Sequence, residues 1–432
     1  MISVNEIKVV MKEQEERMLR TLQEEKIIER DLVIGRNAIA RGAANIITGP
    51  RRCGKSVFAF QLAKKEKFGY INFDDERLNF DPGELNKALE AIYSAKGDVD
   101  LILFDEIQEA PGWERFVGRL VEDKRVIITG SNARLMSREL ATYMTGRHID
   151  HELLPFSFSE FLDYKGFARN AAGTYSTSEK SRIMALLEEY LLKGGFPLGI
   201  RIGRSYVADL FSDIIQRDII QRHRVKMTSK LADLSKYLIS NSSSEVSYSK
   251  LRNMLGVASK HTIQDWISYM EQAYLLFKTE RFSYKLKEAM IAPKKVYAID
   301  TGLATAVSSE IGFARLMETA VAVELQRRSH YFWPPSRQIN YWKDHAQREV
   351  DFVVREGNKV LELLQVTYAS KETEIAGREA ENLLAASAEL KCKNLTIITW
   401  DYEREAGGKN KKISFVPLWK WLLGSGPGGA HR

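Results

Sequence analysis

The sequence has few of the features that mark secreted or membrane proteins. It contains two cysteines, Cys53 and Cys392, in 432 residues, too few for a disulfide framework or a four-cysteine zinc site. No apolar run approaches the roughly 20 residues that span a bilayer, and the first residues lack the pattern of a signal peptide. We therefore expect a cytoplasmic protein that does not use a membrane as a partner.

The composition is that of a globular protein with more than one domain. Hydrophobic residues make up 44% and charged residues 28% of the chain, which is ordinary for proteins that bury cores. The length predicts two or three domains. The formal net charge of +7 favours a nucleic-acid partner, although a balanced surface with a few extra lysines explains it equally well.

A glycine-rich loop between an expected strand and an expected helix carries the clearest chemistry. It fits the pattern G-x-x-x-x-G-K-[ST], in which backbone N–H groups and a helix N-terminus bind phosphates. Lys55 is expected to reach the β- and γ-phosphates, and the Ser56 hydroxyl to ligate Mg²⁺. The residues expected to bind nucleotide are Gly49, Pro50, Arg51, Arg52, Cys53, Gly54, Lys55, Ser56 and Val57.

Two further strands are predicted to end near this loop. Residues 101–104 are apolar and precede Asp105 and Glu106, the form of a buried parallel strand with an acidic carboxyl end. Asp105 is expected to face the Mg²⁺ held by Ser56, and Glu106 to polarise the attacking water. The strand at 125–130 leads to Ser131 and Asn132, which suit a γ-phosphate sensor, a role we assign to Asn132. Together the three segments predict a nucleoside triphosphatase that uses ATP and Mg²⁺.

The surrounding pattern predicts the fold of this first domain. Strands and helices alternate over residues 31–155, which indicates a parallel sheet with right-handed crossovers. A helix over residues 1–30 precedes it, and another is expected over 134–145. Arg147, beyond the sensor strand, is a candidate arginine finger, with a surface salt bridge as the alternative.

These motifs resemble those of the archaeal and bacterial AAA-type ATPases of the GxRRxGKS class. The resemblance continues nearly to the end of the chain. The resemblance implies a P-loop ATPase of α/β fold, then a helical segment, a winged helix and a C-terminal α/β domain like restriction endonucleases. It also implies a homo-oligomer. The residues that carry it are Thr48–Ser56, Asp105–Gln108, Thr129–Asn132, Pro155–Phe161, Gly194–Pro197 and Arg217–Asp218. The expected divisions after the helix at 1–30 and the ATPase at 31–155 are 156–228 (helical), 229–285 (winged helix), 286–423 (nuclease-like) and 424–432 (disordered tail).

The segment at 229–285 reads as helix, polar turn, short helix, longer helix and strand, which is the order of a winged helix. Residues 260–273 are the expected recognition helix. Arg252, Lys260 and His261 are the candidates for contacts with DNA. A winged helix that contacts only proteins is the alternative.

The last third has the layout of a PD-(D/E)xK nuclease core, with a helix, a hairpin and a following strand. Glu324 and Asp351 would hold Mg²⁺, but Gln365 and Thr367 stand where a glutamate and a lysine are expected. Glutamine is a poorer metal ligand than a carboxylate, and threonine cannot supply the charge of lysine. We therefore expect a degenerate nuclease-like domain used for binding.

Three functions follow from this reading. The favoured one is an ATP-driven machine that binds or remodels DNA through the winged helix and the nuclease-like domain. The alternatives are a nucleotide-gated signalling or defence switch that acts through protein contacts, and an active ATP-gated nuclease.

Overall fold

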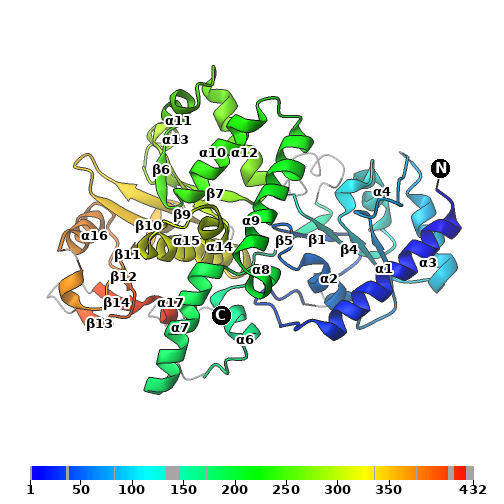
Figure 1. The fold of residues 1–432 in the computed structure, drawn as a ribbon, viewed down its shortest axis with the longest axis horizontal. Coiled ribbons are helices and arrows are strands. Elements are labelled where there is room, and N and C mark those ends of the chain that lie inside the picture. The colour runs from blue at the N-terminus through cyan, green and yellow to red at the C-terminus, as the bar shows by residue number, and fades with distance from the viewer. Residues whose placement is uncertain are drawn as a thin grey trace. The chain divides into compact units, whose positions relative to one another are not determined.

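The computed structural model describes residues 2–424 except 36–37, 82, 133–143, 145, 171–172, 335, 376 and 407–412. The helix expected over 134–145 and the tail expected over 424–432 therefore lie almost entirely outside the described residues. The chain forms two compact units, Met1–Leu154 with Gln272–Tyr274, and Pro155–Glu271 with Leu275–Arg432. Each unit is built around one sheet (Figure 1).

The first unit contains a parallel sheet of five strands in the order β2-β3-β4-β1-β5. β1 and β3 are buried along their whole length, as expected for strands covered on both faces. The strands are β1 (Ala44–Thr48), β2 (Phe68–Asn72), β3 (Leu101–Asp105), β4 (Arg125–Gly130) and β5 (His148–Glu152). The helices are α1 (Val4–Glu24), α2 (Lys55–Ala63), α3 (Asn86–Lys96), α4 (Trp113–Leu120) and a 3-10 turn at Ile107–Glu109.

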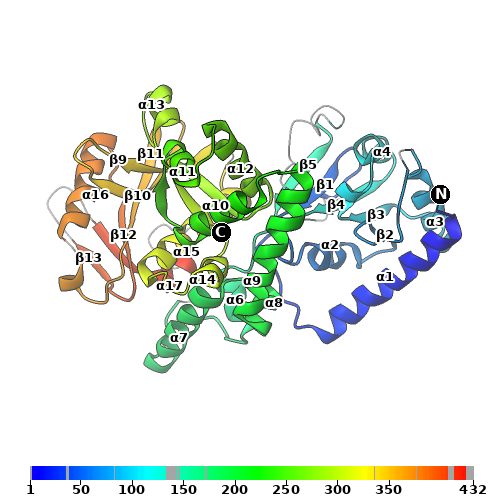
Figure 2. The same cartoon turned by 45° about the horizontal axis from the view of Figure 1, so that its top comes forward.

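Helix α1 packs on the first unit beside α3 and β2 (Figure 2). It begins with a capping box between Ser3 and Glu6, and it contributes apolar side chains to the core. Its Gln14 side chain donates to the carbonyl of Asn72 at 2.9 Å and accepts from the N–H of Asn72 at 2.9 Å. β2 is an edge strand of the sheet, so this amide satisfies backbone groups that a neighbouring strand would otherwise pair.

The second unit contains a mixed sheet of nine strands in the order β13-β14-β12-β11-β10-β9-β7-β8-β6. β8 pairs with β6 and β7, and β7 pairs in parallel with β9. One sheet therefore runs across the division expected between residues 285 and 286. The strands are β6 (Ser244–Val246), β7 (Leu276–Arg281), β8 (Lys294–Ala298), β9 (Arg337–Lys343), β10 (Glu349–Glu356), β11 (Lys359–Val366), β12 (Leu395–Thr399), β13 (Arg404–Ala406) and β14 (Ile413–Pro417).

Helices surround this sheet. Asp218 lies in a π-helix and pairs with Arg222 at 3.8 Å. No described helix in the chain is both long and apolar enough to cross a membrane. The helices are α6 (Phe158–Tyr164), α7 (Thr177–Lys193), α8 (Pro197–Ile202), α9 (Arg204–Asp213), the π-helix Ile214–Gln221, α10 (Thr228–Ser240), α11 (Tyr248–Leu255), α12 (Lys260–Gln272), α13 (Leu286–Ile291), α14 (Thr301–Val307), α15 (Phe313–Tyr331), a 3-10 turn at Glu372–Glu374, α16 (Gly377–Leu390) and α17 (Leu418–Leu422).

The glycine pair after α7 has a structural role inside the second unit. The buried carboxylate of Asp300 accepts from the N–H of Gly195 at 2.6 Å and from the N–H of Gly302 at 2.8 Å. A Cβ atom at Gly194 would lie 1.9 Å from Asp300 Oδ1. Only glycine leaves room for this carboxylate, so the motif fixes the chain between α7 and α8.

Candidate active site

The loop between β1 and α2 curls at residues with left-handed backbone angles. Gly49 and Gly54 have φ values of 147° and 101°, and Arg52 adopts φ 67°. A Cβ atom at Gly49 would lie 2.1 Å from the carbonyl oxygen of Leu153, so this position has no room for a side chain. The loop therefore turns tightly onto the N-terminus of α2, where Val57 continues the helix.

Buried hydrogen bonds hold the loop in place. The guanidinium of Arg30 donates to the carbonyls of Cys53 at 3.2 Å and Leu154 at 2.6 Å. Cys53 Sγ donates to the carbonyl of Leu153 at 3.1 Å, and burial raises the pKa of this thiol. Cys53 is thus a packing residue of the loop, and its thiol is not activated as a nucleophile.

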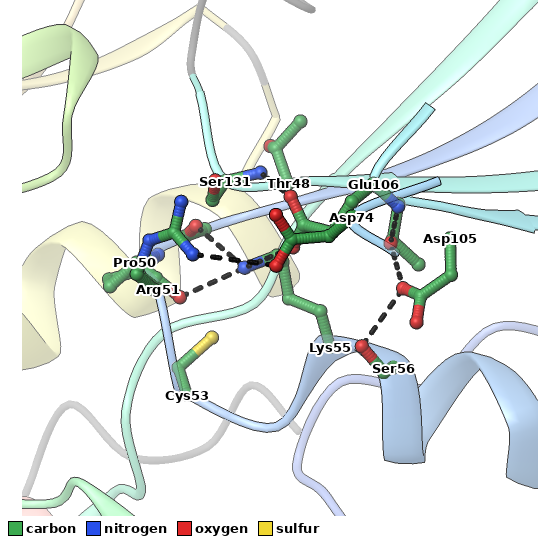
Figure 3. A network of polar contacts seen from close by, with 12 residues as sticks. Thr48, Pro50, Arg51, Cys53, Lys55, Ser56, Asp74, Asp105, Glu106 and Ser131 are labelled. Carbon is green, nitrogen blue, oxygen red and sulfur yellow. Dashed lines mark hydrogen bonds and ion pairs between the residues drawn. The ribbon is translucent and has the colours of Figure 1, made fainter. Parts of the chain in front are cut away.

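Lys55 lies at the start of α2 with its ammonium directed into the loop (Figure 3). Its Nζ donates to the carbonyls of Pro50 at 3.0 Å and Gly49 at 3.2 Å. It also lies 3.6 Å from Glu106 Oε1. The side chain is 3% exposed, so its charge acts in a poorly solvated space, where it interacts strongly with anions.

Asp105, at the end of β3, accepts hydrogen bonds on both of its carboxylate oxygens. Its Oδ1 accepts from Ser56 at 2.9 Å and from the Thr129 hydroxyl. Its Oδ2 accepts from Asn72 at 3.0 Å and Tyr70 at 3.2 Å. Burial, and the neighbouring Glu106 charge, raise the pKa of Asp105 to about 6.

Glu106 follows in a left-handed conformation with φ 51°, which turns its side chain back towards the loop. Its Oε2 accepts from Gln108 at 2.6 Å and from the N–H of Ser131 at 3.1 Å. Burial opposes ionisation, but Lys55 and these hydrogen bonds lower the pKa of Glu106 below its ordinary value. The pKa values of Asp105 and Glu106 are therefore shifted in opposite directions. Such a difference is typical of a site in which two neighbouring acids have different roles.

The end of β4 closes the site. Ser131 and Asn132 are both buried. Ser131 Oγ has no hydrogen-bond partner in the described part of the structure, while its backbone N–H binds Glu106. Arg51, a residue of the loop, lies 3.9 Å from Asp74. The buried Ser131 hydroxyl therefore joins Asn132 as a candidate phosphate sensor.

The structure brings the predicted loop residues together with Asp105, Glu106 and Asn132, but it places Arg147 elsewhere. The carbonyl of Arg147 accepts from Ala44, the first residue of β1, at 2.9 Å, whereas the loop follows the last residue of that strand. Gly49, the first residue of the loop, follows Ala44 by five residues, which corresponds to about 16 Å along an extended strand. The guanidinium pairs with Glu122 at 2.6 Å. The alternative reading of Arg147 as a surface ion pair therefore describes its contacts within the chain.

Sequence reasoning missed several residues that shape the site. Arg30, Tyr70, Asn72 and Thr129 all contact the loop or Asp105. Tyr70 and Asn72 stand in a segment whose pattern reports only a strand, and Arg30 stands at the end of the helix expected over residues 1–30. Thr129 belongs to the motif Thr129–Asn132 that carries the family resemblance. Its place at the end of β4, next to the carboxyl end of β3, is the signal that could have pointed to its contact with Asp105.

The residues expected to act elsewhere lie in the second unit. Lys260 and His261 are exposed at the start of α12, and Arg252 on α11 donates to the side chain of Asn253 at 2.6 Å. Asp351 on β10 lies beside Gln365 on β11, whose Oε1 accepts from the Asp351 N–H at 3.3 Å.

Glu324 does not join Asp351 and Gln365. Its carboxylate accepts from Arg327 at 3.1 Å and from Arg328 at 3.0 Å. The glutamate of α15 that approaches Asp351 is Glu318, because the two bind the same lysine. Six residues separate Glu318 from Glu324, which places them about 120° apart around the helix and about 9 Å apart along it.

Comparisons with known proteins assign an AAA domain to the part of the chain that holds the phosphate-binding loop. Residues 41–162 match a family described as an AAA domain, and residues 184–313 and 313–421 match two domains of unknown function, DUF8612 and DUF4143. An uncharacterized protein of Methanocaldococcus jannaschii is 35% identical over 425 residues, which covers 94% of this chain and 93% of that protein. An uncharacterized protein of Haemophilus influenzae is 28% identical over 397 residues, or 87% and 93%. Among solved structures, a Walker-type ATPase of Pyrococcus abyssi aligns with 14% identity and a TM-score of 0.38, covering 69% of this chain and 95% of that one.

Proposed function

The chain belongs to the family of the Methanocaldococcus jannaschii protein and carries an AAA-type P-loop domain at residues 41–162, and from this premise we propose that its first unit binds and hydrolyses ATP with Mg²⁺. The observation that carries the proposal is the 2.9 Å contact between Ser56 Oγ and Asp105 Oδ1. It joins the N-terminus of the helix after the loop to the acid at the end of β3. An ionised Glu106 stands next to them.

The roles follow from the contacts. The backbone N–H groups of residues 49–55 and the Lys55 ammonium bind the phosphates. Ser56 and Asp105 supply hard oxygen donors of the kind Mg²⁺ prefers, and the bound ion would neutralise charge on the phosphate oxygens. Glu106, kept ionised by Lys55 and its hydrogen bonds, orients the attacking water and accepts a proton from it.

The test compares two variants in one assay of phosphate release and nucleotide binding. Glu106→Gln keeps the shape of the site and removes the carboxylate that orients water, so we expect ATP binding near wild type and turnover reduced by about 100-fold or more. Lys55→Ala removes the charge at the phosphates, so binding itself should weaken. Wild-type turnover in Glu106→Gln would refute the assignment of that residue.

For the second unit we propose a winged helix that contacts DNA through α11 and α12. The order α10, β6, α11, α12, β7, β8, with β6 and β7 both paired to β8, is the order of that fold. Lys260 and His261 are exposed where a recognition helix would meet a duplex. The net charge of +7 is compatible with the same kind of partner, as it is with a surface of balanced charge. ATP hydrolysis would then drive binding or remodelling of DNA.

The chain between β7 and β8 favours a second candidate function, a nucleotide-gated switch that acts through protein contacts. This connection carries α13, on which Leu286, Met290 and Ile291 are 74%, 65% and 74% exposed. Three large apolar side chains on one short segment are typical of a protein-binding surface rather than of one that meets phosphates. A DNA titration separates the two, because the switch predicts no effect of DNA on ATP turnover.

We also propose that the protein acts as a homo-oligomer. Arg147 lies away from the loop of its own chain and its side chain is 48% exposed, so a catalytic role is open to it only at the nucleotide of a neighbouring copy. An arginine supplied in this way stabilises charge on the transferred phosphoryl group.

A further inference from the structure

A buried lysine in the second unit is surrounded by three carboxylates. Lys295 lies on β8, and its side chain is 3% exposed. Its Nζ lies 2.9 Å from Glu318 Oε1, 2.6 Å from Glu349 Oε1 and 3.0 Å from Asp351 Oδ1. An ammonium group has three N–H donors, so the three carboxylates engage all of them.

The carboxylates themselves are held in place. Glu349 and Asp351 are alternate residues of β10 and therefore share one face of the sheet, whereas Glu318 comes from α15. The Tyr297 hydroxyl donates to Glu318 Oε1 at 2.9 Å. The backbone N–H of Val366 donates to Asp351 Oδ2 at 3.0 Å. The acids are thus positioned by β8, β11 and their own elements, and Lys295 completes the arrangement.

The cluster carries more negative than positive charge. Lys343 adds a second ammonium, whose Nζ lies 2.7 Å from Glu245 Oε2 and 3.2 Å from Glu349 Oε2. Two ammonium groups therefore face four carboxylates. Burial is the main cause that raises the pKa of Glu318 above its ordinary value. Burial disfavours the charge of Lys295 as well, but the surrounding acids raise its pKa, so it stays charged.

This arrangement does not fit the metal site that the nuclease-like resemblance implies. Glu324, one of the two expected carboxylate ligands, pairs with arginines. Asp351, the other, directs Oδ1 at the Lys295 ammonium. With Lys295 in place, the described ranges contain no group of three or more His, Cys, Asp or Glu side chains that could hold a metal ion.

We propose that the Lys295 ammonium is the resident cation of this site and occupies the position that a divalent ion would need at Asp351. The cluster joins β8, α15 and β10 by charge, so it stabilises the fold of the second unit. That unit accordingly carries out no metal-dependent phosphodiester cleavage. The proposal is independent of ATP hydrolysis in the first unit.

Replacing the lysine tests this directly in the full chain without nucleotide. Lys295→Met keeps an unbranched side chain but removes the ammonium group. It therefore leaves three buried carboxylates without their cation. Because such charges are costly unless paired, we expect the variant to bind Ca²⁺ and Tb³⁺ there. Ca²⁺ should raise its unfolding temperature by at least about 2 °C and leave that of the wild type unchanged. Tb³⁺ luminescence should gain a site that Lys295→Met/Asp351→Asn lacks.

Lys343→Met is the matched control, because it removes a lysine from the same cluster but leaves the Lys295 ammonium in place. It should show no response to Ca²⁺. A folded Lys295→Met protein without any response would overturn the proposal. A second arm does not depend on that variant: wild type and Asp351→Asn should bind Tb³⁺ and Mn²⁺ alike, and a wild-type metal site lost in Asp351→Asn would show that Lys295 is not the resident cation.

Discussion

Ser56 Oγ donates to Asp105 Oδ1 across 2.9 Å, so the first turn of α2 and the last residue of β3 are tied at one point. The same carboxylate also accepts from Thr129, Tyr70 and Asn72. All of these partners are neutral. Asp105 is therefore fixed in orientation without a cation of its own, which suits an acid that receives Mg²⁺ together with the nucleotide.

This environment predicts a pH-dependent cost of keeping Asp105 ionised in the nucleotide-free protein. Its pKa of about 6 lies above the ordinary value of 3.8, so the folded state holds the proton more tightly than the unfolded chain. Its contribution to the free energy of unfolding is complete below pH 3.8 and is lost as the pH rises to about 6. The loss is at most about 3 kcal/mol, since one pKa unit corresponds to about 1.4 kcal/mol.

Asp105→Asn removes this titration while it keeps the side-chain shape. In EDTA, we expect the variant to gain stability relative to the wild type from pH 5 to pH 7, in denaturant titrations at each pH. Mg²⁺-dependent ATP binding should be lost in the same variant. Equal pH dependence in the two proteins would show that Asp105 is not the group responsible.

The homo-oligomer proposal predicts that Arg147→Ala lowers only the part of ATP turnover that rises with protein concentration. Mixing it with Lys55→Ala should restore turnover, because the Lys55→Ala copies offer Arg147 to the intact phosphate loops of their neighbours. Phosphate release over a concentration series measures both effects. Arg41→Ala is the matched control, since Arg41 forms an exposed pair with Asp100 at 2.6 Å in the same unit. Identical turnover for wild type and Arg147→Ala at every concentration would contradict the in-trans role.

The sequence predicted the parts of the molecule whose signals are local. The loop around Lys55 and the acids at the end of β3 can be recognised because each motif consists of consecutive residues. The AAA domain matched at residues 41–162 includes both motifs. The geometry of Lys295 could not be predicted in this way. Its partners lie 23 to 56 residues away in the chain, and they meet only because β8 and β10 belong to one sheet. The sequence offers both Glu318 and Glu324 on α15 as ligands for a nuclease-like site. Only the rotation of α15 relative to that sheet shows that Glu318, and not Glu324, faces Asp351.

The DNA proposal predicts a specific loss on changing two basic residues together. If Arg252 and Lys260 neutralise phosphates, Arg252→Ala/Lys260→Ala should bind unrelated duplexes more weakly by similar factors. The slope of log affinity against log salt should become shallower by up to about two units, one for each phosphate contact. Fluorescence anisotropy at several salt concentrations measures both quantities. ATP turnover without DNA should be unchanged, because neither residue belongs to the phosphate-binding loop.

A matched control removes the same charge from another part of the surface. Lys64 and Lys65 are exposed after α2, and their double alanine variant should keep the wild-type affinity and salt slope. Equal losses in both double variants would mean that DNA senses only the net charge of the protein. If Arg252→Ala/Lys260→Ala instead binds like the wild type, α11 and α12 do not contact DNA. The exposed apolar residues Leu286, Met290 and Ile291 would then make a protein partner the better explanation for this part of the second unit, because phosphates offer them nothing to bury against.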